Sequence, residues 1–497
     1  MSKPLRSISL IALVLFATFV ASGQDLEAII DIDLETPAII RVRGEFSKAG
    51  KILNRRNLAF LRTVSGADNL GNRVSEVRLS DSAGRPVPFR KLMDGEYLGD
   101  SDFNRWEYNV DISPQKNRYA AAHVSWFADG RGILMLADLL PQFGSAAKKV
   151  SARISFKEPT RFDHESIIHT SEKPGENGYE VSNIEEAVFY VGRGWEWGDS
   201  LTDPFSGDLI TSGSWSFNAG DASAMAKEIH EYYSKLFGPN PSGPPFIGIA
   251  KFPVQTAPGE WQAETRGRNV TIISSDMPFK TQSLQRLHEQ LRHELFHLWI
   301  PNGVNLTGNY DWFYEGFALY ESLKLAVRTN RIGFADFLDT LSRAHTIDSA
   351  QSQRISLIQA SANRFGGSNT QVYARGMLVA FLTDLAVLEK SKGKKSVEDL
   401  LRELYRTHGK SAPPAEGNAA VIDILKTQAN ENSVVEKYIT GVEKIEWTKE
   451  LSATGIEDSD PGPLTTLRVK EKLNGGQKAM LDKLGYNNWR KLSVPSK

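Results

Sequence analysis

The chain has no cysteine among its 497 residues, which excludes disulfide bridges and a lipid-anchored amino-terminal cysteine. Histidine is scarce as well, with nine copies, so two histidines at a functional spacing are informative. Charge of one sign is also lacking, because 59 basic side chains face 60 acidic ones and the net charge is −1. The charges of both signs are mixed, so nothing in the composition points to nucleic acid or an anionic membrane as a partner.

The amino-terminal segment, residues 1–23, has the order of a secretory signal peptide. Basic residues precede a mostly apolar run at 8–20, and the small residues 21–23 follow it. The run is too short to span a bilayer. Export without disulfides is typical of bacteria, so the sequence predicts a periplasmic or secreted bacterial protein that is free of the membrane after signal cleavage. An uncleaved amino-terminal anchor is the alternative.

The remaining chain is long enough for two or three domains. Short alternating or β-branched segments separated by turn residues predict a β-rich domain, whereas helices alternate with a few strands after it and dominate the carboxy-terminal third. The predicted regions are a β-rich domain at 24–205, a mixed domain at 206–345, a helical domain at 346–446, and an extended tail with a short helix at 447–497. The fold class predicted is therefore multidomain α+β.

The pentapeptide His293-Glu294-Leu295-Phe296-His297 lies inside a predicted helix at 282–299. Side chains four residues apart on a helix differ by only about 40° in direction and roughly 6 Å along the axis, so both histidines can bind one ion. Glu294 then lies beside the ion, where it can deprotonate a water that the metal activates. Apolar residues on one face of this helix predict that the motif is buried, and buried imidazoles need partners. A chance motif without metal is the alternative.

The third ligand is sought after the helix, because zinc in catalytic sites takes three protein ligands and leaves a fourth position open. Glu315 lies eighteen residues after His297, beyond a loop that contains Pro301 and Gly303. Such a loop is long enough to reverse direction and present a second helix to the first. Glu315 is the predicted ligand, and Glu321 is the alternative.

These residues resemble the gluzincin zinc metallopeptidases, and within them most closely the glycyl aminopeptidase family. The resemblance spans residues 220–450 and rests on the motif at 293–299, on Trp312-Phe313-Tyr314-Glu315-Gly316, on Val372-Tyr373-Ala374-Arg375-Gly376 and on the segments 384–385, 393–400 and 438–441. It implies a β-rich amino-terminal domain, a thermolysin-like catalytic domain at 206–345 and a helical carboxy-terminal domain.

The resemblance also implies a role for each matching residue. His293, His297 and Glu315 match the ligands of one zinc ion, and Glu294 matches the general base. Tyr373 matches a tyrosine whose hydroxyl stabilises the oxyanion. Glu264 follows a Gly-containing stretch where the family has a glutamate that binds the substrate's free amine, although a surface position is the alternative.

Two features depart from the family pattern. The insert between His297 and Glu315 is shorter, and the residues after 447 are too few for a peptide-binding PDZ module. The predicted function is a zinc-dependent peptidase that acts on peptide substrates as an aminopeptidase. The alternatives are an endopeptidase on the same fold and a catalytically silent scaffold that binds peptides or cell-wall material. The sequence does not specify the oligomeric state.

Overall fold

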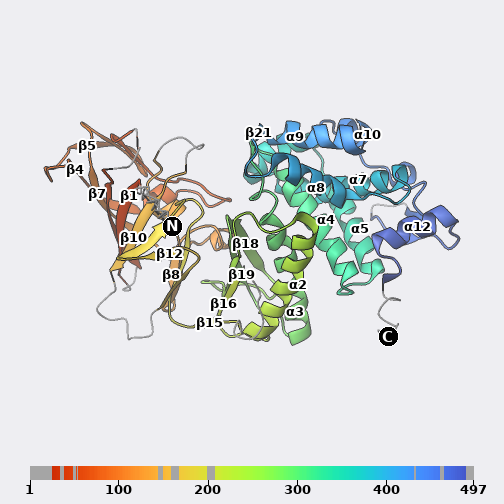
Figure 1. Ribbon diagram of the computed structural model, residues 1–497, viewed down its shortest axis with the longest axis horizontal. Coiled ribbons are helices and arrows are strands. Elements are labelled where there is room, and N and C mark those ends of the chain that lie inside the picture. Colours follow the sequence, from red (N-terminus) through yellow and green to blue (C-terminus); the bar gives the residue numbers. More distant parts are fainter. Residues whose placement is uncertain are drawn as a thin grey trace, which may run out of the picture.

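The computed structural model describes residues 25–33, 38–48, 52, 54–143, 149–157, 167–198, 207–429, 432–458 and 464–488. The predicted signal peptide at 1–23 lies outside these residues. A β-rich amino-terminal region, a central mixed region and a helical carboxy-terminal region follow one another across the molecule (Figure 1). This arrangement agrees with the predicted multidomain α+β organisation.

The amino-terminal region contains a sheet of seven described strands in the order β12-β13-β10-β1-β2-β7-β4. Its strands alternate buried and exposed residues, as β7 (Arg105–Asp111) shows, because one face covers an apolar core and the other meets solvent. A four-stranded sheet, β11-β14-β9-β8, contributes to the same core, and β3-β6-β5 form a small third sheet. The other strands are β1 (Leu26–Asp33), β2 (Ile39–Phe46), β3 (Asn57–Ala59), β4 (Val74–Ser80), β5 (Phe89–Met93), β6 (Glu96–Gly99), β8 (Trp126–Ala128), β9 (Arg131–Met135), β10 (Ala152–Lys157), β11 (Ile167–Thr170), β12 (Lys173–Gly175), β13 (Gly178–Val181) and β14 (Val188–Gly192).

The central region is built on a five-stranded sheet in the order β15-β16-β17-β19-β18. Its strands are β15 (Trp195–Trp197), β16 (Asp208–Ser212), β17 (Phe246–Lys251), β18 (Trp261–Arg266) and β19 (Asn269–Ser274). The three middle strands are parallel and β15 and β18 are antiparallel edges. Since β15 pairs with β16, the central fold begins before residue 206, where the sequence placed its start.

Both faces of this sheet are covered, which explains its nearly continuous apolar strands. Ile247 and Ile249 of β17 share a core with helices α2 (Ala219–Phe237) and α3 (Lys280–His297). Phe246 and Ala250 instead share a core with Tyr190 of the amino-terminal region. The amino-terminal region is therefore packed directly against the sheet that carries the site.

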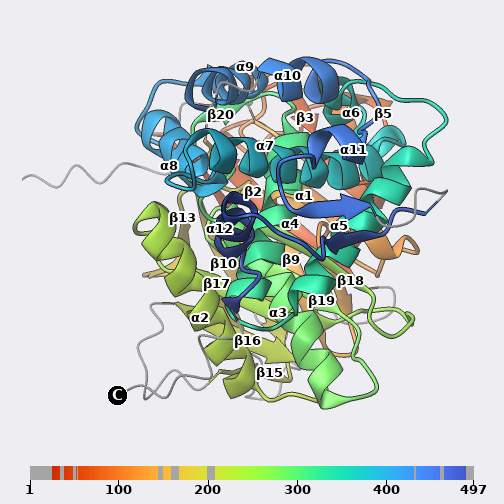
Figure 2. The ribbon, with the colours of Figure 1, turned by 90° about the vertical axis from the view of Figure 1, so that its right-hand side faces the viewer.

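The helical region begins with α4 (Asp311–Arg328), which packs on α3 and on α7 (Gly376–Lys390). Its further helices are α5 (Phe334–Ser349), α6 (Leu357–Ala362), α8 (Val397–His408), α9 (Gly417–Ile424) and α10 (Asn432–Val434). In Figure 2, α8, α9 and α10 lie above α2 and α3. The continuous helical stretch Gln371–Lys390 is long and apolar enough to cross a membrane, but 89% of its most apolar window is buried inside the protein. It is the central core helix of this region.

The residues after 447 differ from the predicted extended tail. A short hairpin, β22 (Ile456–Asp458) and β23 (Leu467–Val469), and helix α12 (Gly475–Leu484) fold back onto α5 and α7. Ile456 and Leu481 are almost fully buried. Apolar side chains spaced along this segment complete the core, so it is an integral part of the helical region. The predicted short helix lies within α12.

Candidate metal centre

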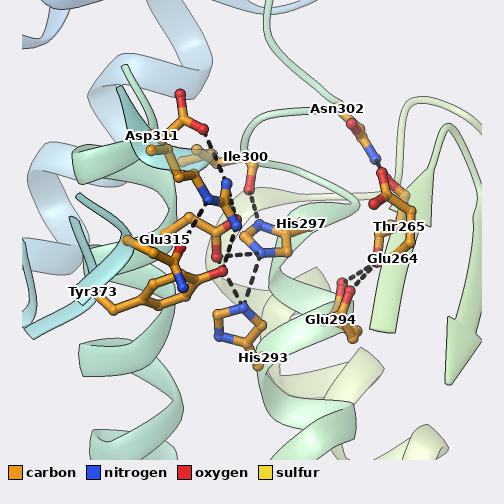
Figure 3. A network of polar contacts seen from close by, with 12 residues as sticks. Glu264, Thr265, His293, Glu294, His297, Ile300, Asn302, Asp311, Glu315 and Tyr373 are labelled. Atoms are coloured by element: carbon orange, nitrogen blue, oxygen red, sulfur yellow. Dashed lines mark hydrogen bonds and ion pairs between the residues drawn. The ribbon is translucent and has the colours of Figure 1, made fainter. Parts of the chain in front are cut away.

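The two histidines of the motif occupy the last turns of α3, where the helix is completely buried. Their Nε2 atoms point to the same spot and lie 3.2 Å apart (Figure 3). The Nδ1 atom of His297 lies 2.9 Å from the carbonyl oxygen of Ile300. Because a carbonyl only accepts, Nδ1 carries a proton, and Nε2 is the atom that could bind a metal once it gives up its own proton.

Glu315 reaches the same spot from α4. Its Oε2 atom is 3.1 Å from Nε2 of His293 and 3.6 Å from Nε2 of His297. All three ligand atoms lie within 4.8 Å of one another. Tetrahedral zinc with bonds of about 2 Å holds its ligand atoms roughly 3.3 Å apart, so the separations and the two-nitrogen, one-oxygen donor set fit this ion.

Two glycines bring Glu315 close to the start of α7. A Cβ atom on Gly316 would lie 2.5 Å from the Cα of Gly376, and one on Gly376 would lie 2.5 Å from the carbonyl oxygen of Trp312. Side chains at either position would push the two helices apart. The close contact between the two backbones therefore fixes the position of Glu315 relative to the first residues of α7.

Burial and charge have opposite effects on the pKa values of two of the candidate ligands, His297 and Glu315. Burial alone would lower the pKa of His297, but its hydrogen bond to Glu315 and that residue's negative charge raise the pKa to about 9. Burial also disfavours ionised Glu315, yet the charge of Arg364 and the hydrogen bonds from both histidines hold its pKa well below the usual range. The site thus keeps one carboxylate ionised inside the protein.

Glu294 lines the same cleft but faces away from the ligand atoms, toward β18 (Figure 3). The hydroxyl of Thr265 donates to its Oε2 atom over 2.7 Å. Burial raises the pKa of Glu294, while the neighbouring histidines act in the opposite direction. A carboxylate that is buried, oriented and easily protonated is suited to accept and release a proton.

Tyr373 lies beside His293 and Glu315, within a π-helical turn, Gln371–Arg375, that precedes α7. Such turns are frequent at functional sites, because the extra residue changes the direction of a side chain. Burial raises the pKa of Tyr373 well above its usual value, and nearby Glu315 adds to this effect. The hydroxyl is therefore protonated and able to donate.

Glu264 lies in the cleft. The sequence did not decide between this position and one on the open surface. Glu264 lies on edge strand β18 and forms an ion pair with His123, which comes from the amino-terminal region. Burial would raise the pKa of Glu264, but the charge and hydrogen bond of His123 lower it to about 2. His123, which is isolated in the sequence, gave no signal of this role.

The cleft has a volume of about 730 Å³ and draws its lining from all three regions. Tyr119 and His123 contribute from the amino-terminal region, Trp261 from β18 and Phe365 from the helical region. A hollow of about 810 Å³ on the outer face of the seven-stranded sheet contains none of the histidine and glutamate ligands.

The alternative ligand Glu321 is not in the cleft. It is fully buried on another side of α4, near Lys324. Six residues correspond to about 240° around a helix, so Glu315 and Glu321 cannot face the same ion. Arg364 and Asp311, in contrast, lie in the site but carried no signal in the sequence, because their role depends on contacts between distant segments.

No known family profile matches the sequence, and no curated protein matches it. Solved structures do. The chain is similar to an aminopeptidase N family protein from Idiomarina loihiensis, with 14% identity over 87% of this chain and 78% of the other and a TM-score of 0.69. At this identity the likeness concerns the fold.

Two further structures share the arrangement. A mutant M1 zinc metallopeptidase from Deinococcus radiodurans bound to a Tyr-Ser-Ala substrate has 17% identity, coverage of 82% and 91%, and a TM-score of 0.51. Native leukotriene A4 hydrolase from Saccharomyces cerevisiae has 14% identity, coverage of 89% and 69%, and a TM-score of 0.51. The chain therefore has the fold of M1 zinc metallopeptidases.

Proposed function

We propose that the protein is a zinc-dependent peptidase that removes amino-terminal residues from peptides. The observation that carries this proposal is the convergence of His293, His297 and Glu315, with Glu294 and Tyr373 in the same cleft. The fold shared with M1 zinc metallopeptidases supports it. We further propose the closer relationship to glycyl aminopeptidases, with a thermolysin-like catalytic domain, that the motifs suggest.

The three ligands would hold zinc, whose chemistry in such sites is to polarise a carbonyl and to lower the pKa of water. Glu294 accepts the proton of the attacking water and passes it to the leaving amine. Thr265 holds the carboxylate of Glu294 at the cleft wall formed by β18 through its 2.7 Å hydrogen bond. Tyr373 donates its proton to the oxygen on which negative charge develops.

The aminopeptidase assignment rests on Glu264. Its ionised carboxylate lies on the cleft wall formed by β18, on the same strand as Thr265. A positively charged substrate amine would be attracted there once it replaces the contact with His123. A periplasmic or secreted location of the bacterial protein, based on the predicted signal peptide, is part of the same proposal.

The decisive experiment measures zinc content and turnover together. We expect one zinc per chain in the purified protein, and Glu294→Gln should retain the zinc while turnover of peptide substrates falls by about 10³-fold or more. Glu289→Gln is the matched control, because Glu289 lies on the same helix but is exposed and forms a surface ion pair with Arg286. It should keep full activity. A metal-free protein, or an active Glu294→Gln variant, would refute the proposal.

Substrates with free and acetylated amino termini test the aminopeptidase assignment. We expect hydrolysis of the free peptides only, because an acetylated terminus has no charge for Glu264 to attract. Glu264→Gln should raise KM for free peptides and leave the zinc content unchanged. Equal hydrolysis of both substrate types would indicate an endopeptidase instead.

A further inference from the structure

Arg364 lines the cleft and contacts several of its side chains, but it has no role in the reaction as described. It lies in a short 3-10 turn, Arg364–Gly366, between α6 and the π-helical turn, and its side chain is only 14% exposed. Its Nη1 atom lies 2.9 Å from Oδ1 of Asp311 and 2.9 Å from Oε1 of Glu315, and its Nη2 atom donates to the hydroxyl of Tyr373. One guanidinium thus contacts a metal ligand and the proposed oxyanion donor.

The contact with Glu315 separates the roles of the two carboxylate oxygens. Oε1 accepts from Arg364, whereas Oε2 faces the Nε2 atoms of His293 and His297. A carboxylate that is free to rotate can offer both oxygens to a cation. A guanidinium that holds one oxygen leaves only the other for the ion.

The contact with Tyr373 sets the direction of its proton. Arginine has only donors, so the phenol oxygen accepts from Arg364, and its own proton must point elsewhere. Tyr373 lines the cleft beside His293. The acceptor for that proton in this structure is the side chain of Glu315, so the proton is held on the side of the ligand atoms, where the reacting carbonyl would compete for it in the proposed function.

We propose that Arg364 is a positioning residue that limits Glu315 to one metal-binding oxygen and directs the Tyr373 proton at the oxyanion. The inference rests on the proposed function. A role as a receptor for a substrate carboxylate is disfavoured, because Asp311 and Glu315 already contact the guanidinium and neutralise its charge.

The first test is spectroscopic and does not depend on activity. The metal-free protein is loaded with one equivalent of Co²⁺, and its visible absorption is compared with that of Arg364→Ala. Without Arg364, Oε1 of Glu315 can also bind, and the bands of Co²⁺ weaken as its coordination number rises. We expect a roughly twofold loss of intensity in Arg364→Ala and a spectrum close to that of the native protein in Arg364→Lys.

The second test is a double-mutant cycle with Tyr373→Phe. Arg364→Ala should lower kcat about 30- to 100-fold with little change in KM, as expected when an oxyanion donor is misdirected. In the Tyr373→Phe background the same change should lower kcat by only about fivefold, because the hydroxyl that Arg364 orients is already gone. Additive effects of the two substitutions would overturn the role through Tyr373.

Arg328→Ala is the control for loss of a partly buried arginine. Arg328 lies on α4, as Glu315 does, and pairs with Glu398 at 2.6 Å. Its removal should lower the melting temperature without changing the Co²⁺ spectrum or kcat. If Arg364→Ala is unstable, Arg364→Gln provides a second variant with a side chain of similar length.

The outcomes distinguish this inference from the function on which it rests. A native protein that binds no Co²⁺ or zinc would remove the proposed function and the inference together. A native protein that binds metal and hydrolyses peptides, with an Arg364→Ala variant of the same spectrum and kcat, would overturn the role of Arg364 alone.

Discussion

Helix α4 carries two buried carboxylates, Glu315 and Glu321, six residues apart. Glu315 faces the cleft and contacts two histidines and Arg364. Glu321 faces a closed cluster in which Lys324 lies 3.8 Å from it, 2.8 Å from Asp384 and 3.1 Å from Glu398. The same residue type on one helix therefore serves two different environments.

The difference lies in how each environment balances charge. Around Glu315, Arg364 and the histidines favour the ionised form and hold its pKa well below the usual range. Around Glu321, burial raises the pKa to about 8 despite the attraction of Lys324. Neither oxygen of Glu321 has a hydrogen-bond partner in the described part of the chain. An open cleft supports an ionised ligand, whereas a closed core with three carboxylates favours a protonated one.

The largest effect is expected at the open site. Glu315→Gln should reduce zinc binding and lower turnover on the order of 10³-fold, because a neutral amide replaces the charged ligand. Glu321→Gln should leave both within about twofold. Metal titration and steady-state kinetics on the two variants measure the contrast. Equal losses in both would mean that the two carboxylates are not separate in function.

A large effect on stability is expected in the closed cluster. Lys324→Met should destabilise the protein by about 3–5 kcal/mol, because it leaves Asp384 and Glu398 buried with one cation fewer. Denaturant unfolding of the metal-free protein measures the change. The zinc affinity of the folded variant should remain native, since no ligand contacts Lys324. A cost below about 1 kcal/mol would show that the cluster does not depend on this cation.

The pH dependence of stability should reveal the protonated state of Glu321. Its pKa is raised in the folded protein from 4.5 to about 8, so folding stabilises the protonated form, and this contribution is lost as the pH rises through that window. Between pH 4.5 and about pH 8, the free energy of unfolding of the native protein should fall by up to about 1.4 kcal/mol per pH unit relative to that of Glu321→Gln. Unfolding curves at pH 5 to 9 test this, and parallel profiles would contradict it.

The smallest effect is expected from one hydrogen bond in the open site. Thr265→Val removes the donor to Glu294 with little change in shape, and kcat should fall about fivefold, equivalent to about 1 kcal/mol. Thr271→Val is the control, because Thr271 pairs with buried Tyr190 outside the cleft. An unchanged kcat in Thr265→Val would show that Glu294 is oriented by packing alone.

Local patterns predicted much of this molecule. The helix predicted at 282–299 is α3 (Lys280–His297), because helical periodicity reflects burial of one face. Strand β15 is only three residues long, and its place in the central sheet depends on its pairing with β16, which no local pattern indicates. The carboxy-terminal hairpin was missed for the same reason.

The sequence alone determined the pairing of His293 with His297, because a helix brings residues four apart to one face without help from the rest of the chain. Only the tertiary structure decided between Glu315 and Glu321, joined His123 to Glu264 and brought Arg364 to both Glu315 and Tyr373. The choice of Glu315 depends on the contact of Gly316 with Gly376, which sets how α4 lies against α7. Contacts between distant segments arise from the packing of whole elements, and no local spacing encodes them.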